Sequence, residues 1–213
     1  MSRILITSGP TREYLDPVRY LSNGSSGRMG SALAAAGLAA GHEIIVVSGP
    51  VAQPYPDAAQ VVPVVSTQEM LDACRAAFAT CDGLIAAAAP CDYRPQTLAT
   101  QKIRKTGQPL ELRLVETPDI VAALGSQKRA TQWIVGFALE TDDIQRRALA
   151  KLRAKNCDLI AANGPRAIDA LSTRVRLLAP AGDLVAMLSG SKQRIARQLM
   201  AIIDQRFARP GCA

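Results

Sequence analysis

GPTREYLDPVRYLSNGSSGRMG, the segment from Gly9 to Gly30, decides the fold through the two elements that it connects. The run before it, Arg3–Ser8 (RILITS), has the composition of a buried strand. The run after it, Ser25–Gly41, is rich in alanine, opens with serine and closes with glycine, which are common helix caps. A glycine turn before a helix favours an anion, because backbone N–H groups and the helix dipole face it. The segment therefore predicts a β–α unit with an anion site.

The rest of the chain repeats this alternation of buried strand and helix. Further strands are expected at His42–Ser48, Val61–Ser66, Gly83–Ala89, Leu110–Val115, Trp133–Leu139 and Asp158–Ala162, and further helices at Thr67–Thr80, Thr117–Leu124, Asp142–Lys155 and Ser191–Phe207. Arg174–Leu178 and Leu184–Leu188 are expected to form a C-terminal hairpin. Such alternation is typical of a parallel sheet with helices on both faces. The fold class is thus α/β, a Rossmann-like doubly wound and mainly parallel sheet, with residues 1–213 as one domain.

Pro90–Gly107 (PCDYRPQTLATQKIRKTG) interrupts the pattern, because it is polar, basic and without a clear period. We expect a long loop, and loops of this length within a domain are usually functional. Residues 90–116 also contain the alternating run LELRLV. We interpret the loop as a flap over a site.

The composition is that of a globular protein, with 48% hydrophobic and 20% charged residues. No apolar run approaches the roughly 20 residues of a membrane span, so a soluble, cytoplasmic protein without membrane contact is expected. The net charge of +7 suits either nucleic acid or a small anionic ligand. Aromatic residues make up only 4% of the chain and form no stripe with the basic residues, so the small ligand is favoured over nucleic acid.

Cysteine and histidine offer little for catalysis or metal binding. The cysteines form no CxxC pair, and free thiols are expected at Cys74, Cys81, Cys91, Cys157 and Cys212. His42, the single histidine, is expected at a surface turn, which argues against His-based triads. Cys91 has no base beside it to make it a nucleophile. The remaining chemistry is a transfer reaction catalysed by orientation and electrostatics.

A dinucleotide site is the obvious rival interpretation of the glycine turn. That site requires GxGxxG directly after the first strand and an acidic residue about 20 residues later to hold the ribose. Here a long polar segment separates Gly9 from Gly27, and Ser48 stands where the acid is required. Nicotinamide binding is therefore disfavoured. A turn without a ligand stays open, and so does a non-catalytic module that binds a nucleotide or nucleic acid.

Three further groups of charged residues are candidates for the site. Asp92 follows a predicted strand at the edge where open α/β sheets bind ligands, although such residues also serve as caps. Lys102–Lys105 (KIRK) is either a solvated run or a cluster that neutralises a polyphosphate. Lys151 and Lys155 lie one helical turn apart, on either a binding face or a solvent face.

The run DPVRYLSNGSSGRMG resembles a motif of the phosphopantothenoylcysteine synthetases. Further motifs of that family are matched in the same order by AAAAPCDYRP, QKIRK, TPDIVAALG, VGFALET and KNCDLIAANG, so the resemblance covers nearly the whole chain. It implies a ligase that joins 4′-phosphopantothenate to L-cysteine, with CTP and Mg²⁺, through an acyl-cytidylate. It also implies a homodimer. Residues 90–116 are the expected flap and dimerisation segment, since pairing of two edge strands would protect an exposed edge. In many bacteria the family has a flavin-dependent decarboxylase half; a stand-alone synthetase and an excised domain are both open.

The same resemblance implies roles for individual residues. Asn23 and Lys102 are implied to be catalytic, at the acyl group and at the charge that develops during cytidylate formation. The implied acid-binding residues are Asn23, Ala88, Ala89 and Asp92. The implied nucleotide-binding residues are Gly9, Ser25, Gly27, Gly30, Ala86, Ala87, Ala88, Asp92, Lys102, Pro118, Asp119, Ile120, Val121, Phe137, Lys151, Lys155 and Asn163. No protein ligand of the metal is identified.

A few positions depart from the family pattern. Six residues differ from the one that is common in the family at that position: Gly24 replaces His, Arg28 replaces Lys, Cys91 replaces Ala, Arg104 replaces Lys, Thr117 replaces Asn and Gly164 replaces Asp. Positive charge is kept at Arg28 and Arg104. The roles of Arg12, Asp16 and Arg19 are open between buried ion pairs that hold the first segment and contacts with substrate.

Overall fold

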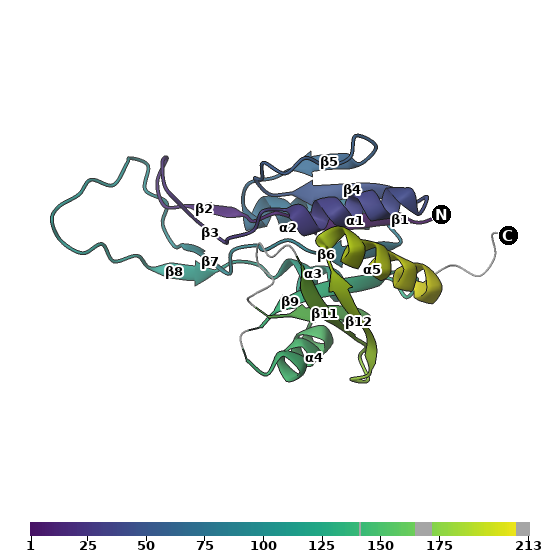
Figure 1. The fold of residues 1–213 in the computed structure, drawn as a ribbon. Helices are drawn as coiled ribbons and strands as arrows, with labels where there is room; N and C mark the ends of the chain where they lie inside the picture. The colour runs from purple at the N-terminus through teal and green to yellow at the C-terminus, as the bar shows by residue number, and fades with distance from the viewer. Residues whose placement is uncertain (141, 165–171, 208–213) are drawn as a thin grey trace.

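The computed structural model describes residues 1–140, 142–164 and 172–207, and an eight-stranded sheet of order β12-β11-β10-β9-β6-β1-β4-β5 forms its centre (Figure 1). The parallel strands are β1 (Arg3–Ser8), β4 (Glu43–Ser48), β5 (Gln60–Pro63), β6 (Gly83–Ala86), β9 (Trp133–Leu139) and β10 (Leu159–Asn163). An antiparallel hairpin of β11 (Thr173–Leu178) and β12 (Leu184–Gly190) extends the sheet beyond β10. The predicted fold class is confirmed, whereas the assignment of residues 1–213 to one domain stays a prediction.

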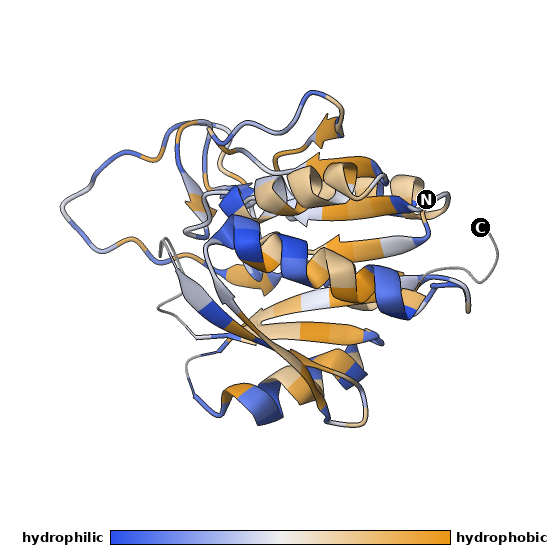
Figure 2. Cartoon of the chain, turned by 45° about the vertical axis from the view of Figure 1, so that its right-hand side comes forward, coloured by the Kyte–Doolittle hydropathy of each residue, from blue (hydrophilic) through white to orange (hydrophobic). Residues whose placement is uncertain are grey.

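Helices cover both faces of the sheet. One face carries α1 (Arg28–Ala39) and α5 (Lys192–Phe207), and the other carries α2 (Thr67–Phe78), α3 (Ile120–Gly125) and α4 (Ile144–Ala154). Because successive strand residues point to opposite faces, Ile4 and Ile6 pack under α1 and α5, while Leu5 packs under α2. Figure 2 shows the apolar strands behind the polar outer face of α5. Burial on both faces explains why the strands are apolar runs.

The order of the strands creates a crevice at the carboxyl end of β1. The chain adds β4 and β5 on one side of β1, and then crosses to add β6, β9 and β10 on the other. The connections after β1 and β6 therefore lead to opposite faces of the sheet, and ligands bind where they diverge. Gly30 allows α1 to approach this edge closely, because a Cβ at Gly30 would lie 2.0 Å from Ser8 Oγ.

Two small antiparallel ribbons project from this edge (Figure 1). The first pairs β2 (Arg12–Tyr14) with β3 (Tyr20–Ser22), inside the Gly9–Gly30 segment. The second pairs β7 (Tyr93–Pro95) with β8 (Leu114–Glu116), and the loop between them extends away from the sheet. The predicted loop Pro90–Gly107 thus contains a short strand, and the predicted strand Leu110–Val115 is confined to its last residues.

His42 differs from its prediction as a surface residue. Its side chain is only 7% exposed, and its Nε2 lies 2.7 Å from Asp204 Oδ1 in α5. Its Nδ1 accepts a hydrogen bond from the Ser2 N–H at 3.2 Å. The ring therefore fastens the start of the chain to the last helix, a contact between distant segments that a single sequence does not reveal.

The described cysteines, Cys74, Cys81, Cys91 and Cys157, are free and buried. Burial raises the pKa of Cys74 to about 12, and also raises the thiol pKa of the other three. These thiols are therefore poor nucleophiles. Cys212 lies outside the described residues. Within the described ranges, no helix combines the length and apolar character needed to cross a membrane.

Candidate functional site

Two cavities lie at the carboxyl edge of the sheet, on either side of the segment that follows β6. The first has a volume of about 480 Å³ and includes residues of α3. The second has a volume of about 490 Å³ and includes the start of α1. Ala88, Asp92 and Phe137 line both cavities, which therefore share a wall. The crevice at the carboxyl end of β1 thus consists of two compartments that meet at these residues.

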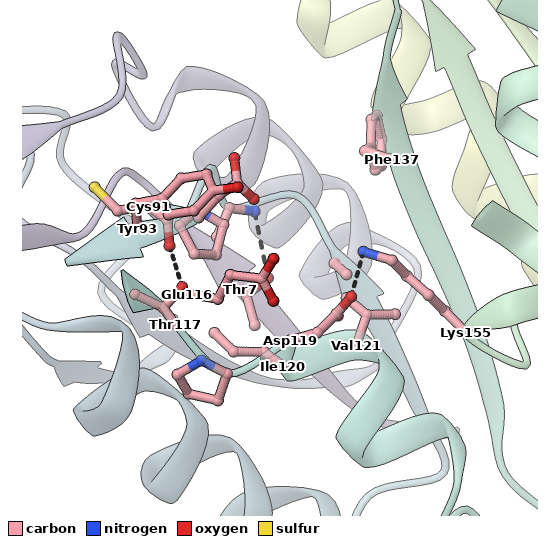
Figure 3. Close-up of a pocket in the computed structure, with 15 residues that line it drawn as sticks. Thr7, Cys91, Tyr93, Glu116, Thr117, Asp119, Ile120, Val121, Phe137 and Lys155 are labelled. Atoms are coloured by element: carbon pink, nitrogen blue, oxygen red, sulfur yellow. Dashed lines mark hydrogen bonds and ion pairs between the residues drawn. The ribbon is translucent and has the colours of Figure 1, made fainter. Parts of the chain in front are cut away.

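The first cavity is acidic. Asp92, Glu116 and Asp119 line it, and Lys155 is the cation that the described residues contribute (Figure 3). Asp119 caps α3 by accepting a hydrogen bond from the Ala122 N–H at 3.0 Å, and it pairs with Lys155 Nζ at 2.9 Å. Burial opposes ionisation of Asp119, but the Ala122 N–H and the Lys155 ammonium lower its pKa. Lys155 is thereby engaged, and we call this compartment the acidic cavity.

The second cavity is basic. Arg28, Lys151 and Lys192 line it, and Asp92 is the carboxylate that the described residues contribute. Lys151 Nζ lies 2.6 Å from Glu140 Oε1, and Glu140 is itself buried. The three cations come from three different helices, so the chain gathers positive charge from distant positions. We call this compartment the basic cavity.

The start of α1 adds hydrogen-bond donors to the basic cavity. Gly27 is the N-cap, with a φ of 74°, and no side chain caps the first turn. Ser25 and Ser26 lie beside it in the cavity wall. The helix begins at Arg28 and not at Ser25, because the left-handed Gly27 turns the chain just before it. Uncapped N–H groups and the helix dipole favour an anion here.

Asn23 joins the first segment to the wall between the cavities. Its side-chain amide donates to the carbonyl oxygens of Pro90, at 2.8 Å, and Ala89, at 3.3 Å. Asn23 follows β3 directly, so the β2–β3 ribbon sets its position. The predicted acid-binding residues Asn23, Ala88, Ala89 and Asp92 all line the basic cavity. The structure therefore brings this predicted group together.

A buried network of threonines fixes the backbone beside Asp92. Thr11 Oγ1 accepts a hydrogen bond from the Cys91 N–H and lies 2.8 Å from Thr67 Oγ1. The Cys91 carbonyl accepts from Thr117 Oγ1, as Figure 3 shows, and from Thr67 Oγ1. These bonds tie the segment after β6 to the residue before β2, to the first residue of α2 and to the segment before α3. Local sequence patterns do not indicate this network, because its members are far apart in the chain.

Lys102 lines neither cavity in the described structure and is exposed. Its neighbour Ile103 is held by a buried carboxylate, Asp16, which accepts from the Ile103 N–H at 3.1 Å and from Arg19 Nε at 2.9 Å. Burial opposes ionisation of Asp16, but Arg19 and the N–H groups of Val18 and Ile103 hold its pKa far below its ordinary value. Asp16 and Arg19 thus form an ion pair, one of the two roles that the sequence left open, in which Asp16 is buried and the Arg19 side chain is 41% exposed. The pair fastens the loop at Ile103.

A chain of hydroxyl groups occupies the end of β4, where a dinucleotide site needs an acid. Tyr55 OH donates to Ser8 Oγ at 2.8 Å and lies 2.7 Å from Ser48 Oγ. Ser8 Oγ in turn donates to the Gly27 carbonyl at 3.3 Å. The Ser48 hydroxyl is therefore hydrogen-bonded to Tyr55 within the protein. This contact supports the argument against nicotinamide binding, which requires an acidic side chain at this position to hold the ribose.

The predicted nucleotide-binding residues divide between the two cavities. The acidic cavity contains Ala86, Pro118, Asp119, Ile120, Val121 and Lys155, the basic cavity contains Ser25, Gly27, Gly30, Ala87, Lys151 and Asn163, and both contain Ala88, Asp92 and Phe137. Gly9 lines neither, and its carbonyl instead accepts from the Ala89 N–H at 2.9 Å.

Sequence reasoning missed several residues of the cavities, among them Glu116, Thr173 and Lys192. Glu116 directly precedes the TPDIVAALG motif, and that position was a usable signal. Thr173 and Lys192 belong to the hairpin and the last helix, far from every motif.

Comparison with known proteins identifies the family to which the chain is similar. A family model described as "DNA/pantothenate metabolism flavoprotein C-terminal domain" matches residues 1–207. The coenzyme A biosynthesis bifunctional protein CoaBC of Vibrio vulnificus is 46% identical over 162 residues, which are 75% of this chain and 40% of that protein. The chain thus spans less than half the length of this curated relative.

Solved structures share the fold. The crystal structure of the C-terminal domain of a CoaBC protein has a TM-score of 0.80 and 35% identity, over 96% of this chain and 94% of that one. A mutant of Cab2 in complex with phosphopantothenate-cysteine has a TM-score of 0.81 and 18% identity, over 97% of this chain and 86% of that one. At that identity the second likeness concerns the fold alone.

Proposed function

The chain belongs to the family of the DNA/pantothenate metabolism flavoprotein C-terminal domain, and from this premise we propose that it is a ligase of coenzyme A biosynthesis that joins 4′-phosphopantothenate to L-cysteine. We also propose CTP as its co-substrate and an acyl-cytidylate as the intermediate. One observation carries the proposal: an acidic and a basic cavity meet at Ala88, Asp92 and Phe137. A reaction between a nucleotide and an acid needs two neighbouring binding sites, one for each substrate.

The chemistry follows from the two steps of such a ligation. A carboxylate oxygen of the acid attacks the α-phosphorus of CTP, the bond to the β-phosphate breaks, and pyrophosphate leaves with the electron pair. The neutral amine of cysteine then attacks the acyl carbonyl, releases a proton to solvent, and CMP leaves. The cytosine amino group suits the acidic cavity and the anionic acid suits the basic one, so the reacting atoms meet at the shared wall. Cations near this wall stabilise the charge on the departing phosphates.

Asn23 is proposed to hold the acyl phosphate, as a polar group that does not titrate. Its bonds to the Ala89 and Pro90 carbonyls support this placement at the shared wall. Asn23→Asp puts an anion beside the phosphates and removes the amide donor, so turnover is expected to fall by about a hundredfold or more. Asn23→Gln keeps a neutral amide but moves it by one methylene group. Comparison of the two variants therefore separates the effect of displacing the amide from the effect of adding a negative charge. Wild-type turnover by Asn23→Asp would contradict this role.

Lys102 is proposed to reach the nucleotide when the 90–116 flap closes. The Asp16–Arg19 pair holds Ile103 next to it, so Lys102 lies at the fixed base of the loop and its long side chain supplies the reach. Lys102→Ala is expected to abolish formation of the cytidylate, measured as pyrophosphate release without cysteine. Lys105→Ala, on the same exposed loop, is the matched control. Equal rates for the two variants would remove Lys102 from the mechanism.

Mg²⁺ is proposed to arrive bound to CTP. Among the described residues, no group of three or more His, Cys, Asp or Glu side chains is placed to hold a metal. Mg²⁺ commonly keeps several waters and binds substrate phosphates together with one or two carboxylates. Asp92, which lines both cavities, is the carboxylate best placed for that contact. The ion would neutralise charge on the departing pyrophosphate.

A homodimer through the flap is proposed on the exposure of apolar side chains. Tyr93, Leu98 and Leu110 are 50%, 58% and 56% exposed, and all belong to residues 90–116. Exposed apolar groups gathered on one segment mark contact surfaces. A decarboxylase domain or protein is a second proposed partner, because the Vibrio vulnificus relative is a bifunctional protein. The reduced, buried thiols suit a cytoplasmic enzyme.

The direct test is a pyrophosphate and CMP assay with purified protein. We expect CMP release only when CTP, 4′-phosphopantothenate and L-cysteine are all present, and pyrophosphate release when cysteine is omitted. A parallel reaction with ATP decides the nucleotide. Absence of turnover with any nucleotide overturns the ligase, and faster turnover with ATP overturns the choice of CTP.

A further inference from the structure

We propose that Glu140 is a positioning residue, which holds the ammonium of Lys151 at the wall of the basic cavity so that it neutralises phosphate charge of the bound nucleotide. The inference rests on the proposed function and deepens it, because it names a residue on which a nucleotide contact depends. In the described structure Glu140 lines neither cavity, whereas Lys151 lines the basic one. An effect of Glu140 on the reaction must therefore pass through another side chain.

The sheet fixes the backbone of Glu140. Its N–H donates to the Asn163 carbonyl at 3.0 Å, just beyond the last register pair of β9 and β10, which is Leu139 with Asn163. Because successive strand residues alternate between the faces, Glu140 lies on the same face as Ala138, which packs in the core beneath α2, α3 and α4. The carboxylate is therefore directed at the helical layer that contains α4, and not at solvent.

The burial of Glu140 makes Lys151 an important partner. Glu140 is 6% exposed, and its Oε1 is buried without a hydrogen bond of ordinary geometry in the described structure. A buried carboxylate is costly unless a cation compensates its charge. The Lys151 ammonium, 2.6 Å from that oxygen, supplies the compensation. Because a partly buried pair is screened less by solvent and salt than an exposed one, the carboxylate holds this ammonium firmly.

The anchor matters because the Lys151 side chain is 47% exposed. A long, free lysine side chain loses rotamer freedom when it binds a ligand. Glu140 restricts the side chain before the ligand arrives, and it engages one of the three N–H donors of the ammonium, so two remain for phosphate oxygens. A charge that is already in place needs no reorganisation during the reaction, which makes it effective against the charge on departing phosphates.

Lys155, one helical turn further along α4, shows what distinguishes the Glu140 contact. Lys155 lines the acidic cavity and pairs with Asp119 at 2.9 Å. The Asp119 side chain is 47% exposed and also caps α3, so its attraction for Lys155 is screened by solvent. Adjacent turns of α4 thus present one ammonium to each cavity, and the ammonium in the basic cavity is the one that a buried carboxylate holds.

A double-mutant cycle in steady-state kinetics tests the proposal. Glu140→Gln keeps the shape of the side chain and removes its charge, and it is expected to raise KM for CTP about tenfold, while KM for L-cysteine stays within about twofold of wild type. Lys151→Met removes the ammonium and is expected to raise KM for CTP at least as much. In the Lys151→Met background, Glu140→Gln should change KM for CTP by less than about twofold, because Glu140 acts through the lysine. Glu140→Asp keeps the charge but shortens the side chain, so its KM should lie between those of wild type and Glu140→Gln.

Asp158→Asn is the matched control. Asp158 directly precedes β10 and pairs with Lys128, also at 2.6 Å, and neither of these two residues lines a cavity. The change should lower the free energy of unfolding in urea, because it breaks a lysine–carboxylate pair of the same length, but it should leave KM for CTP at the wild-type value. The control therefore separates a kinetic effect of Glu140→Gln from a loss of stability.

Titration calorimetry with CTP separates this inference from the ligase proposal, because binding needs no turnover. About tenfold weaker binding of CTP by Glu140→Gln, with no further loss when Glu140→Gln is added to Lys151→Met, supports the inference even if cysteine is never ligated. An equal effect of Glu140→Gln in the wild-type and Lys151→Met backgrounds shows that Glu140 acts independently of the lysine, and overturns the inference. Unchanged KM and affinity for CTP in Glu140→Gln, or no binding of CTP by the wild type, also overturn it.

Discussion

Thr11→Val is the most informative perturbation of the wall between the two cavities. Thr11 is fully buried, accepts the Cys91 N–H at 2.8 Å and lies 2.8 Å from Thr67 Oγ1. Valine has nearly the same shape, so the change removes hydrogen bonds without opening a cavity. The orphaned Cys91 N–H costs about 1–3 kcal/mol, and the bond lost by Thr67 about 0.5–1 kcal/mol. Thr67 keeps the Cys91 carbonyl as a partner. The expected loss of unfolding free energy is about 2.5 kcal/mol, or about 5–10 °C in Tm for a domain of this size.

Urea unfolding followed by tryptophan fluorescence measures this loss. Trp133 is the single tryptophan of the chain; it is buried and stacks on Phe207 with ring centroids 5.2 Å apart, so its emission reports on the core. Thr106→Val, on an exposed part of the flap, is the matched control, with an expected effect of about 0.5 kcal/mol or less. The double variant with Thr67→Val should lose about 0.5–1 kcal/mol less than the sum of the two single variants, since they share a bond. A loss below about 0.5 kcal/mol for Thr11→Val would refute the inferred network.

Two further predictions concern the sheet edge and the acidic cavity. Gly30→Ala places a Cβ 2.0 Å from Ser8 Oγ and should cost about 1–3 kcal/mol in urea unfolding. Gly24→Ala, where a Cβ meets nothing within 4 Å, should be tolerated, and equal stability of the two variants would contradict the close approach of α1. The pKa of Asp119 is lowered in the folded state, so its pairing stabilises the protein above the ordinary carboxyl pKa and is lost as pH falls through the lowered folded value. Asp119→Asn keeps a helix cap but loses the Lys155 pair, so its unfolding free energy at pH 7 should be lower than that of wild type by about 1 kcal/mol or less. This difference should shrink as pH falls through the range where Asp119 titrates. A difference that stays constant with pH would disprove the pairing.

The strands were predictable because burial on both faces forces long apolar runs. Trp133–Leu139 was predicted with its observed bounds, and the other strands of the parallel sheet within a few residues. Helix starts were less predictable, because several residues compete for each cap. The helix predicted from Thr67 does begin there, with Ser66 as its cap, whereas the helix predicted from Thr117 begins only at Ile120, with Asp119 as its cap. In both cases the threonine hydroxyl instead bonds the Cys91 carbonyl, a tertiary demand that local sequence does not report.

The candidate site was predictable where a motif is local and hidden where the fold assembles it. Ala88 and Asp92 follow one strand, so the strand itself indicates the edge at which they lie. Lys192 enters the basic cavity only because an antiparallel hairpin reverses the chain before α5. The division of the nucleotide-binding set into two compartments was equally hidden, since most of its members lie in loops and helices whose placement around the sheet edge depends on the tertiary fold.

The long segment between β1 and α1 explains why this edge binds differently from a dinucleotide site. A short glycine turn would bring one ligand directly onto the first helix. Here the segment instead folds as the β2–β3 ribbon, whose end carries Asn23 to the Ala89 and Pro90 carbonyls. The same segment supplies Asp16, which fastens the flap at Ile103. One insertion therefore contributes to the wall between two cavities and anchors the loop beside them, so a site for one extended cofactor becomes a site where two ligands can meet.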